Sequence, residues 1–197
     1  MREIAILLAL VLCFYAITRL GRRRGDDSRS AKLMKKYKTL TRDLLTATAD
    51  EELVEAVVAH VLAEATEARK PNPAVTLSKM PQPFTVVYSI WAVCKEMAHG
   101  DYAALTRTAT REMLEPACDG LSVVGAAATA AALKVVVDTY RADEDTAEAE
   151  HAFHAAVEQE CPLALCVTYI RDHVAELMGE EPAEEPAPAI EDTTDGE

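Results

Sequence analysis

The sequence predicts an all-α protein, with a single N-terminal transmembrane helix followed by one cytoplasmic helical-bundle domain of about six to seven helices. Three observations carry this prediction. An apolar run from Ile4 to Ile17 is followed directly by a cluster of arginines. From residue 49 onward, apolar residues recur at spacings of three and four, as on one face of a helix. The alternation of apolar and polar residues that is typical of strands does not occur.

The apolar run predicts a membrane anchor at residues 1–20. As a helix it would measure roughly 21 Å, which spans a hydrocarbon core of about 30 Å only if Arg19 reaches the interface and the bilayer thins locally. A cleaved signal peptide is the alternative. A signal peptide begins with a positively charged segment, but here the single basic residue, Arg2, is offset by Glu3. No small-residue cleavage site follows the apolar run. A retained anchor is therefore favoured.

Basic residues on one side of the anchor predict its orientation. Arg19, Arg22, Arg23 and Arg24 all follow the apolar run, and loops rich in Lys and Arg stay on the cytoplasmic side. The prediction is a single-pass protein of the inner (plasma) membrane, with its N-terminus outside and its domain cytoplasmic. The same arginines are expected to contact anionic headgroups at the membrane surface, each worth about 1 kcal/mol, although they could serve orientation alone.

One face of the predicted anchor carries the small residues Ala5, Ala9 and Cys13. Small residues at this spacing let two membrane helices pack closely, which would make a homodimer. Alanine is also common in apolar helices without such a role. The pattern leaves both alternatives open.

Composition divides the rest of the chain, whose formal net charge is −13. Residues 21–48 are predicted to be a basic juxtamembrane linker that could include a helix. Residues 49–178 form the helical domain, which is acidic, and residues 179–197 form an acidic, Pro-rich tail that is predicted to be disordered. Because an acidic domain repels phosphates, direct binding of nucleic acid is not expected. The expected partners are the lipid bilayer and a protein.

Capping residues, glycines and prolines set the expected bounds of the helices. The first begins at Asp50 as its N-cap, buries a face that includes Leu53, and ends before Pro71. The second, 84–98, is apolar on nearly all sides, so it is predicted to be the central helix with Trp91 in the core. The other helices are expected at 101–108, 111–124, 126–140, 151–160 and 163–178.

The central helix and the segment after it carry a family resemblance. The stretch FTVVYSIWAVCKEMAHGDYAALTRT, followed by a helix ending in LSVVGA, resembles a bacterial all-helical family of unknown function that includes a DNA-mimic protein. The hallmark of that family is Glu-Val-x-Asn-Gly-Gly at the end of the central helix. Glu96 and Gly100 match its Glu and first Gly, whereas His99 replaces the Asn and Asp101 the second Gly. The resemblance runs from about residue 51 to 177 and includes YIRDH near the end.

The resemblance implies a helical interaction module without established enzymatic chemistry. In the mimic member, surface carboxylates imitate the phosphates of DNA and occupy a DNA-binding protein. The acidity of this chain makes a DNA-mimic regulator one alternative function. Acidic runs more often form a solvated surface, and a membrane anchor is an awkward location for a partner that lives on the nucleoid. A membrane-tethered binding module is therefore the favoured interpretation.

The turn after the central helix is the predicted binding site. Glu96, His99, Gly100, Asp101 and Tyr102 lie where a helix ends and backbone groups lack partners. A histidine beside two carboxylates could also act as a general base or as part of a metal site. A histidine at a helix C-terminus followed by an Asp N-cap is the simpler explanation.

A metal-dependent enzyme is the second alternative function. His151 and His154 are three residues apart on one predicted helix and could join His99 and Asp101, or His173 or Glu158. The five cysteines form no CxxC pair, and no nucleophile or phosphate-loop motif is present. The sequence therefore predicts no cofactor, no catalytic residue and no metal ligand with a recognisable motif, and a binding module is favoured over an enzyme.

Overall fold

The computed structural model describes residues 28–69, 72–99, 102–106 and 108–180. Every regular element in these ranges is a helix and none is a strand, which confirms the all-α prediction. The predicted anchor, 1–20, and the tail beyond residue 180 lie outside the described residues. Among the helices that are described, none combines the length and the apolar character needed to cross a membrane.

A helix over 28–36 comes first, and the chain then folds into ten α-helices and one 3₁₀-helix within the described residues. These are α2 (Arg42–Ala47), α3 (Asp50–Glu67), α4 (Pro73–Leu77), α5 (Gln82–His99), α6 (Tyr102–Thr106), η1 (Ala109–Met113), α7 (Leu114–Val123), α8 (Ala127–Arg141), α9 (Ala147–Glu160), α10 (Pro162–Asp172) and α11 (Val174–Leu177). Six to seven longer helices were expected. The difference comes from short helices that local caps create and from breaks within two of the predicted helices.

Local capping explains these differences. The side chain of Asn72 accepts a hydrogen bond from the backbone of Ala74, and Pro73 occupies the first turn, so α4 forms in a segment that the apolar periodicity missed. The segment predicted as 111–124 begins as η1, and α7 follows it. The predicted 163–178 helix is interrupted at His173, which leaves the helical conformation and separates α10 from α11.

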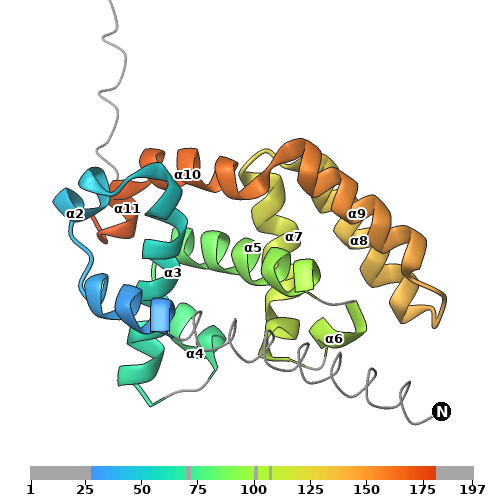
Figure 1. The fold of residues 1–197 in the computed structure, drawn as a ribbon, viewed down its shortest axis with the longest axis horizontal. Helices are drawn as coiled ribbons and strands as arrows, with labels where there is room; N and C mark the ends of the chain where they lie inside the picture. The colour runs from blue at the N-terminus through green and yellow to red at the C-terminus, as the bar shows by residue number, and fades with distance from the viewer. Residues whose placement is uncertain (1–27, 70–71, 100–101, 107, 181–197) are drawn as a thin grey trace, which may run out of the picture.

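The central position predicted for α5 is confirmed. Figure 1 shows α5 running through the middle of the molecule between α3 and α7. Val87, Ile90 and Val93 on α5 are all buried. Gly120 on α7 lets the two helices approach closely, because a Cβ there would lie 3.4 Å from the Ile90 side chain and from the Val86 carbonyl. This helix contact is the centre of the main apolar core.

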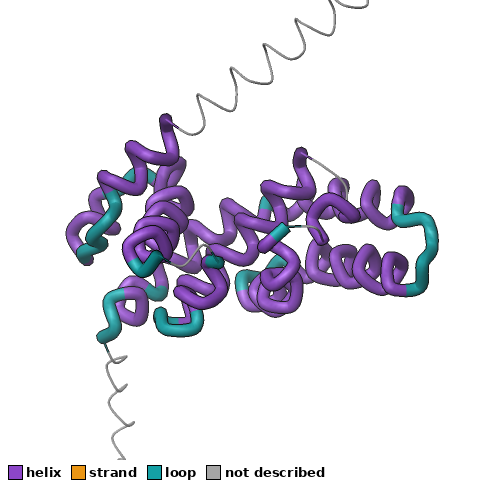
Figure 2. The backbone as a smooth tube through the Cα atoms, turned by 90° about the horizontal axis from the view of Figure 1, so that it is seen from below, coloured by secondary structure: helices purple, strands orange, loops and turns teal. Residues whose placement is uncertain are grey.

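Helices α8 and α9 form an antiparallel hairpin that extends from one end of the molecule (Figures 1 and 2). Phe153 is the buried residue of α9, with 1% of its surface exposed, so one ring carries much of the apolar contact made by that helix. At the other end of the hairpin, the Glu160 carboxylate accepts hydrogen bonds from the backbone N–H groups of Ala128 and Thr129 and from the Thr129 hydroxyl, at 2.7–3.0 Å. The end of α9 thus caps the start of α8.

This cap makes part of the stability pH-dependent. The hydrogen bonds from Thr129 and Ala128 hold the pKa of Glu160 below its ordinary value of 4.5. A carboxylate with a lowered pKa in the folded state stabilises the protein above its unfolded pKa, and this contribution is lost as the pH falls through the folded pKa. Glu160→Gln should therefore lower the melting temperature by a few degrees at neutral pH. The difference from wild type should shrink on acidification below pH 4.5. A difference independent of pH would contradict the role of the charge.

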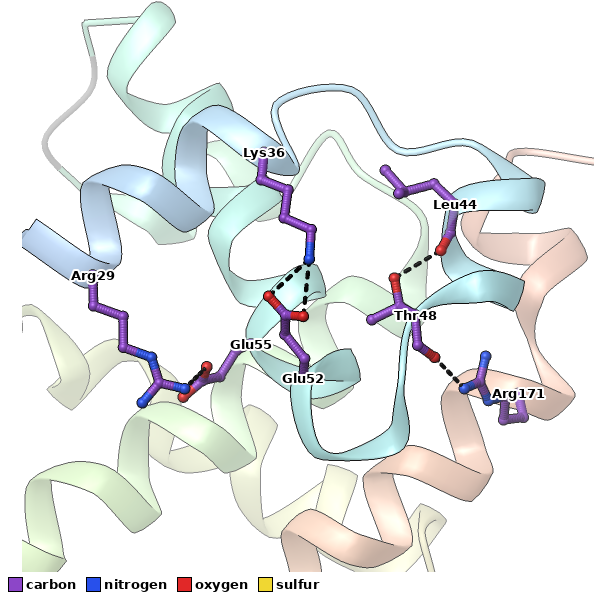
Figure 3. Close-up of polar contacts among 7 residues, drawn as sticks. All are labelled: Arg29, Lys36, Leu44, Thr48, Glu52, Glu55 and Arg171. Carbon is purple, nitrogen blue, oxygen red and sulfur yellow. Dashed lines mark hydrogen bonds and ion pairs between the residues drawn. The ribbon is translucent and has the colours of Figure 1, made fainter.

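The N-terminal part of the domain is joined to α3 by ion pairs. Arg29 lies 2.6 Å from Glu55 and Lys36 lies 2.9 Å from Glu52, and both contacts are visible in Figure 3. The Lys36 ammonium lowers the pKa of Glu52. Beneath these pairs, Tyr37 packs in a small separate apolar cluster against α3. Residues 28–48, which the sequence assigns to a linker, therefore pack against the helical domain.

Helix α3 starts one residue earlier than predicted, and Asp50 has a role other than that of N-cap. Ala49 is the N-cap and provides no side-chain cap, while Asp50 is the first helical residue. The Asp50 carboxylate instead accepts hydrogen bonds from Arg171 of α10 at 2.7 and 3.3 Å. Leu53 is fully buried as expected. Propensity alone could not identify the Asp50 partner, which is more than a hundred residues away in the chain.

Candidate functional site

The predicted binding turn lies between α5 and α6. Helix α5 ends at His99 and α6 begins at Tyr102. Gly100, Asp101 and the side chain of His99 lie outside the described residues. The membrane-surface arginines Arg19, Arg22, Arg23 and Arg24 also lie outside them. Two of the five predicted binding residues, Glu96 and Tyr102, can therefore be placed with their side chains.

Tyr102 is held in the protein and does not project from it. Its side chain is 2% exposed, and its ring packs edge-on against Tyr140 of α8, with 4.9 Å between the centroids. The backbone N–H of Tyr102 donates to Glu150 of α9 at 3.3 Å, and the Thr146 hydroxyl donates to the same carboxylate oxygen at 2.5 Å. The beginning of α6 is therefore attached to the α8–α9 hairpin. Tyr102 can form the wall of a site, but it is not the exposed contact that its position in the sequence suggested.

Glu96 is half-buried on α5. Burial, together with the negative charge of Glu96, raises the pKa of Tyr88 to about 12. The Tyr88 phenol therefore stays neutral at physiological pH. Tyr102 is fixed against Tyr140 of α8, and no hydrogen bond or ion pair joins its described side chain to Glu96. The described part of the predicted turn does not bring these two side chains together as one cluster.

A groove centred on Trp91 lies elsewhere on the described surface. Two adjoining cavities, of about 470 and 540 Å³, share Glu55, Trp91 and Leu163 in their walls. They form what we call the Trp91 groove, with α3 and α10 along its sides and α5 between them. Its remaining apolar lining is contributed by Leu33, Val54, Val58, Ala59, Leu62, Cys94, Ala98, Val157, Ala164 and Val167. The groove is elongated and apolar along its length.

Charges of both signs line the Trp91 groove. Arg29 and Lys95 line one cavity, and Asp50 and Glu51 line the other. The Lys95 ammonium lies over the Trp91 ring, 4.7 Å from its centroid. A cation in this position stabilises the indole by a cation–π interaction. Glu55, in the wall that the two cavities share, is paired with Arg29 at 2.6 Å. The mainly apolar groove is therefore lined by charges of both signs.

Cys94 lines the groove without being a reactive group. Burial raises the pKa of its thiol to about 11, so almost none of it is thiolate at neutral pH. Cys166 is fully buried, and its pKa is raised by burial to about 12. None of the four described cysteines forms a disulfide. The chemistry of the groove is therefore that of an apolar binding surface.

Sequence reasoning placed Trp91 in the core and missed the groove. The apolar residues on nearly all sides of α5 predicted a core position for Trp91, whereas the structure leaves it partly exposed in the groove. Leu163 follows Pro162 in the first turn of α10 and is 39% exposed. Nothing in the sequence sets this leucine apart from other apolar residues of the helix. The position of this leucine beside Trp91 depends on tertiary packing.

Each described histidine that was considered as a metal ligand is either exposed or packed against an aromatic ring. His151 is exposed, and the ring of His154 packs edge-on against Phe153. The His173 ring stacks on Tyr169 and its Nδ1 lies 2.8 Å from the Tyr169 carbonyl oxygen. Nowhere in the described ranges do three or more His, Cys, Asp or Glu side chains come together in a group that could hold a metal ion. The other proposed ligands, His99 and Asp101, fall outside the residues whose side chains are described.

Comparison of the chain with protein-family models, with curated proteins and with solved structures found no match. The functional argument therefore rests on the groove and on the charge distribution.

Proposed function

We propose that this chain is a membrane-tethered cytoplasmic binding module, and that its occupant is an amphipathic helix of a protein partner seated in the Trp91 groove. The observation that carries the proposal is the groove itself, an elongated apolar channel between α3 and α10 with Trp91 and Leu163 in its walls. Partly buried tryptophans are enriched among the residues that dominate binding energy at protein interfaces.

The charges in the walls favour one direction for a helical occupant. A helix has a partial positive charge at its N-terminus and a partial negative charge at its C-terminus. Glu51, in the wall of one cavity, suits the N-terminus of the bound helix, and Lys95, in the wall of the other, suits its C-terminus. The other charged residues, Asp50 and Arg29, are already paired with Arg171 and Glu55. Apolar residues spaced at i, i+3/i+4 and i+7 on the partner would face the groove, as in other helix-in-groove complexes.

The proposed tether brings this groove to the inner leaflet. Arg29, in the wall of the groove, follows closely on the basic segment that the sequence places after the membrane anchor. A partner that itself lies at or in the membrane is thus the one whose effective concentration the tether would raise. The same placement keeps the acidic domain beside, and repelled from, an anionic lipid surface.

Leu163→Glu should weaken partner binding without unfolding the protein. The leucine is 39% exposed, so a charge there costs little stability, but in the complex it would be buried unpaired in an apolar groove. We expect the affinity to fall about tenfold or more. Val135→Glu is the matched control, because Val135 is an apolar residue that is 54% exposed on α8 and does not line the groove.

The measurement begins in intact cells with the full chain carrying a photocrosslinking residue at Leu163 or at Val135. A partner captured from Leu163 alone is identified, and its helical segment is then titrated against the purified full chain in detergent. Trp91 is the only tryptophan of the chain, so its fluorescence reports occupation of the groove directly. Equal capture from both positions, or no change in Trp91 emission, would overturn the proposal. Recovery of the chain in the soluble fraction of these cells would overturn the tether.

A further inference from the structure

A second cavity, of about 530 Å³, follows the α5–α6 turn. Residues of α6, η1, α7 and α8 form its walls, namely Tyr102, Thr106, Arg111, Glu112, Leu114, Glu115, Tyr140 and Arg141. It shares no lining residue with the Trp91 groove. Its volume lies within the range of about 300–1,000 Å³ that is usual for small-molecule sites. Its lining is mainly polar, unlike that of the groove.

Two guanidinium groups meet at this cavity. Arg111 comes from η1 and Arg141 from the last residue of α8, and the side chain of neither forms a hydrogen bond or ion pair with any other described residue. This arrangement is unusual in a chain with 33 acidic and 20 basic residues, where an exposed arginine has many carboxylates available. Arginine is the side chain best suited to planar, bidentate binding of oxyanions.

The phenol of Tyr102 lies in the cavity wall together with the two arginines. Burial raises the pKa of this phenol, whereas the positive charges of Arg141 and Arg111 act on it in the opposite direction. Because Arg111 and Arg141 line the same cavity, an anion bound in it would be attracted by both positive charges.

The remaining wall residues indicate which groups the uncharged part of a ligand would carry. Tyr140 is 41% exposed, and its ring is fixed edge-on by Tyr102. Its hydroxyl lies 3.4 Å from that of Thr106, so the cavity offers a hydroxyl pair beside an aromatic surface. Glu112 accepts a hydrogen bond from Asn72 at 2.7 Å, which orients its carboxylate. With Glu115, it would repel a second anion and accept hydrogen bonds from hydroxyl or amino groups.

We propose that the cavity between α6, η1 and α8 binds a small phosphomonoester whose organic part carries hydrogen-bond donors, with Arg111 and Arg141 holding the phosphate. A phosphomonoester carries about −1.5 to −2 charges at neutral pH and three acceptor oxygens, so it can accept hydrogen bonds from both guanidiniums and balance more of their charge than a single carboxylate can. The volume exceeds that of a phosphate group, and the two glutamates provide acceptors for the rest of the ligand. The proposal does not depend on the Trp91 groove.

The test is a calorimetric titration of the purified full chain with ribose 5-phosphate and with adenosine 5′-monophosphate. Inorganic phosphate and adenosine are titrated separately as controls, because each represents one half of the nucleotide. We expect saturable binding of at least one phosphomonoester with a Kd below about 1 mM, tighter than the binding of either half. Preference for the nucleotide would assign the exposed Tyr140 ring to base stacking. Absence of saturable binding for both phosphomonoesters overturns the proposal.

Charge-neutral variants identify the site. Arg141→Gln and Arg111→Gln should each weaken binding about tenfold or more, because each removes charge-assisted hydrogen bonds to the phosphate. Lys134→Gln is the control, since it removes one positive charge from α8 two turns before Arg141, at a position outside this cavity. An equal loss in Lys134→Gln would reduce the effect to general electrostatics and overturn the site. Leu163→Glu should leave phosphomonoester binding unchanged.

Discussion

Phe153→Ala is expected to lower the free energy of unfolding by about 3–5 kcal/mol. Phe153 is 1% exposed and is the buried residue of α9. Its removal leaves a cavity between the hairpin and the core that no other buried side chain of α9 can fill. Because α9 also supplies Glu150, which binds the start of α6, the loss should extend to the α5–α6 turn. Equilibrium unfolding in urea measures the change in free energy.

Hydrogen exchange can show which helices lose stability in Phe153→Ala, in addition to the size of the loss. Native-state hydrogen exchange in the variant should accelerate most at the amides of α8 and α9 and least at those of α3 and α5. Val135→Ala is the control, since Val135 lies on the same hairpin but is 54% exposed, and its truncation should cost no more than about 0.5 kcal/mol. A similar loss in both variants would show that Phe153 has no special role in holding the hairpin.

Arg171→Met is expected to cost about 2–3 kcal/mol of stability. The Arg171 guanidinium donates to the carbonyl oxygens of Leu45 and Thr48, both at 2.6 Å, and to the Asp50 carboxylate at 2.7 Å. Figure 3 shows the contact with Thr48 at the end of α2. Methionine keeps much of the apolar stem but leaves these carbonyls without their donor. Thermal and urea unfolding of the full chain measure the loss.

Two further variants separate the carbonyl contacts from the ion pair. Arg171→Lys keeps the charge but not the planar fork of donors, so it should recover little of the lost stability. Asp50→Asn keeps the carbonyl contacts and removes only the ion pair with Arg171, in which the aspartate side chain is 66% exposed, so it should cost less than about 1 kcal/mol. If Asp50→Asn were as costly as Arg171→Met, the ion pair would be the main contribution.

Much of the helical framework could be predicted from residue order. The stripe through Leu53, Val57 and Val61 is fully buried, as the periodicity of α3 indicated, and α5 is the central helix. Helix-forming patterns depend on neighbours three and four residues apart, which the sequence displays directly. The errors occurred at ends and breaks, such as the N-cap of α3 and the interruption at His173, where cap geometry and packing decide.

The candidate sites could be predicted less well. Tyr102 was singled out by its place after the central helix, and the structure places it in the wall of a cavity with Arg111 and Arg141. Neither arginine attracted notice in the sequence, because isolated basic residues on separate helices form no motif. Leu163 likewise marked only the start of a predicted helix, 163–178. Each becomes a candidate only when helices distant in the chain are placed side by side.

The sequence by itself determined the all-helical class and the buried faces of α3 and α5, because these depend on local periodicity. The address at a membrane stays a prediction. Only the tertiary structure decided where the helices leave space and which polar groups meet. Arg171 reaches the end of α2 from near the other end of the domain, and Trp91 stays partly exposed in a groove that α3 and α10 also line. Such contacts depend on the summed packing of many helices, and no local pattern of residues encodes that sum.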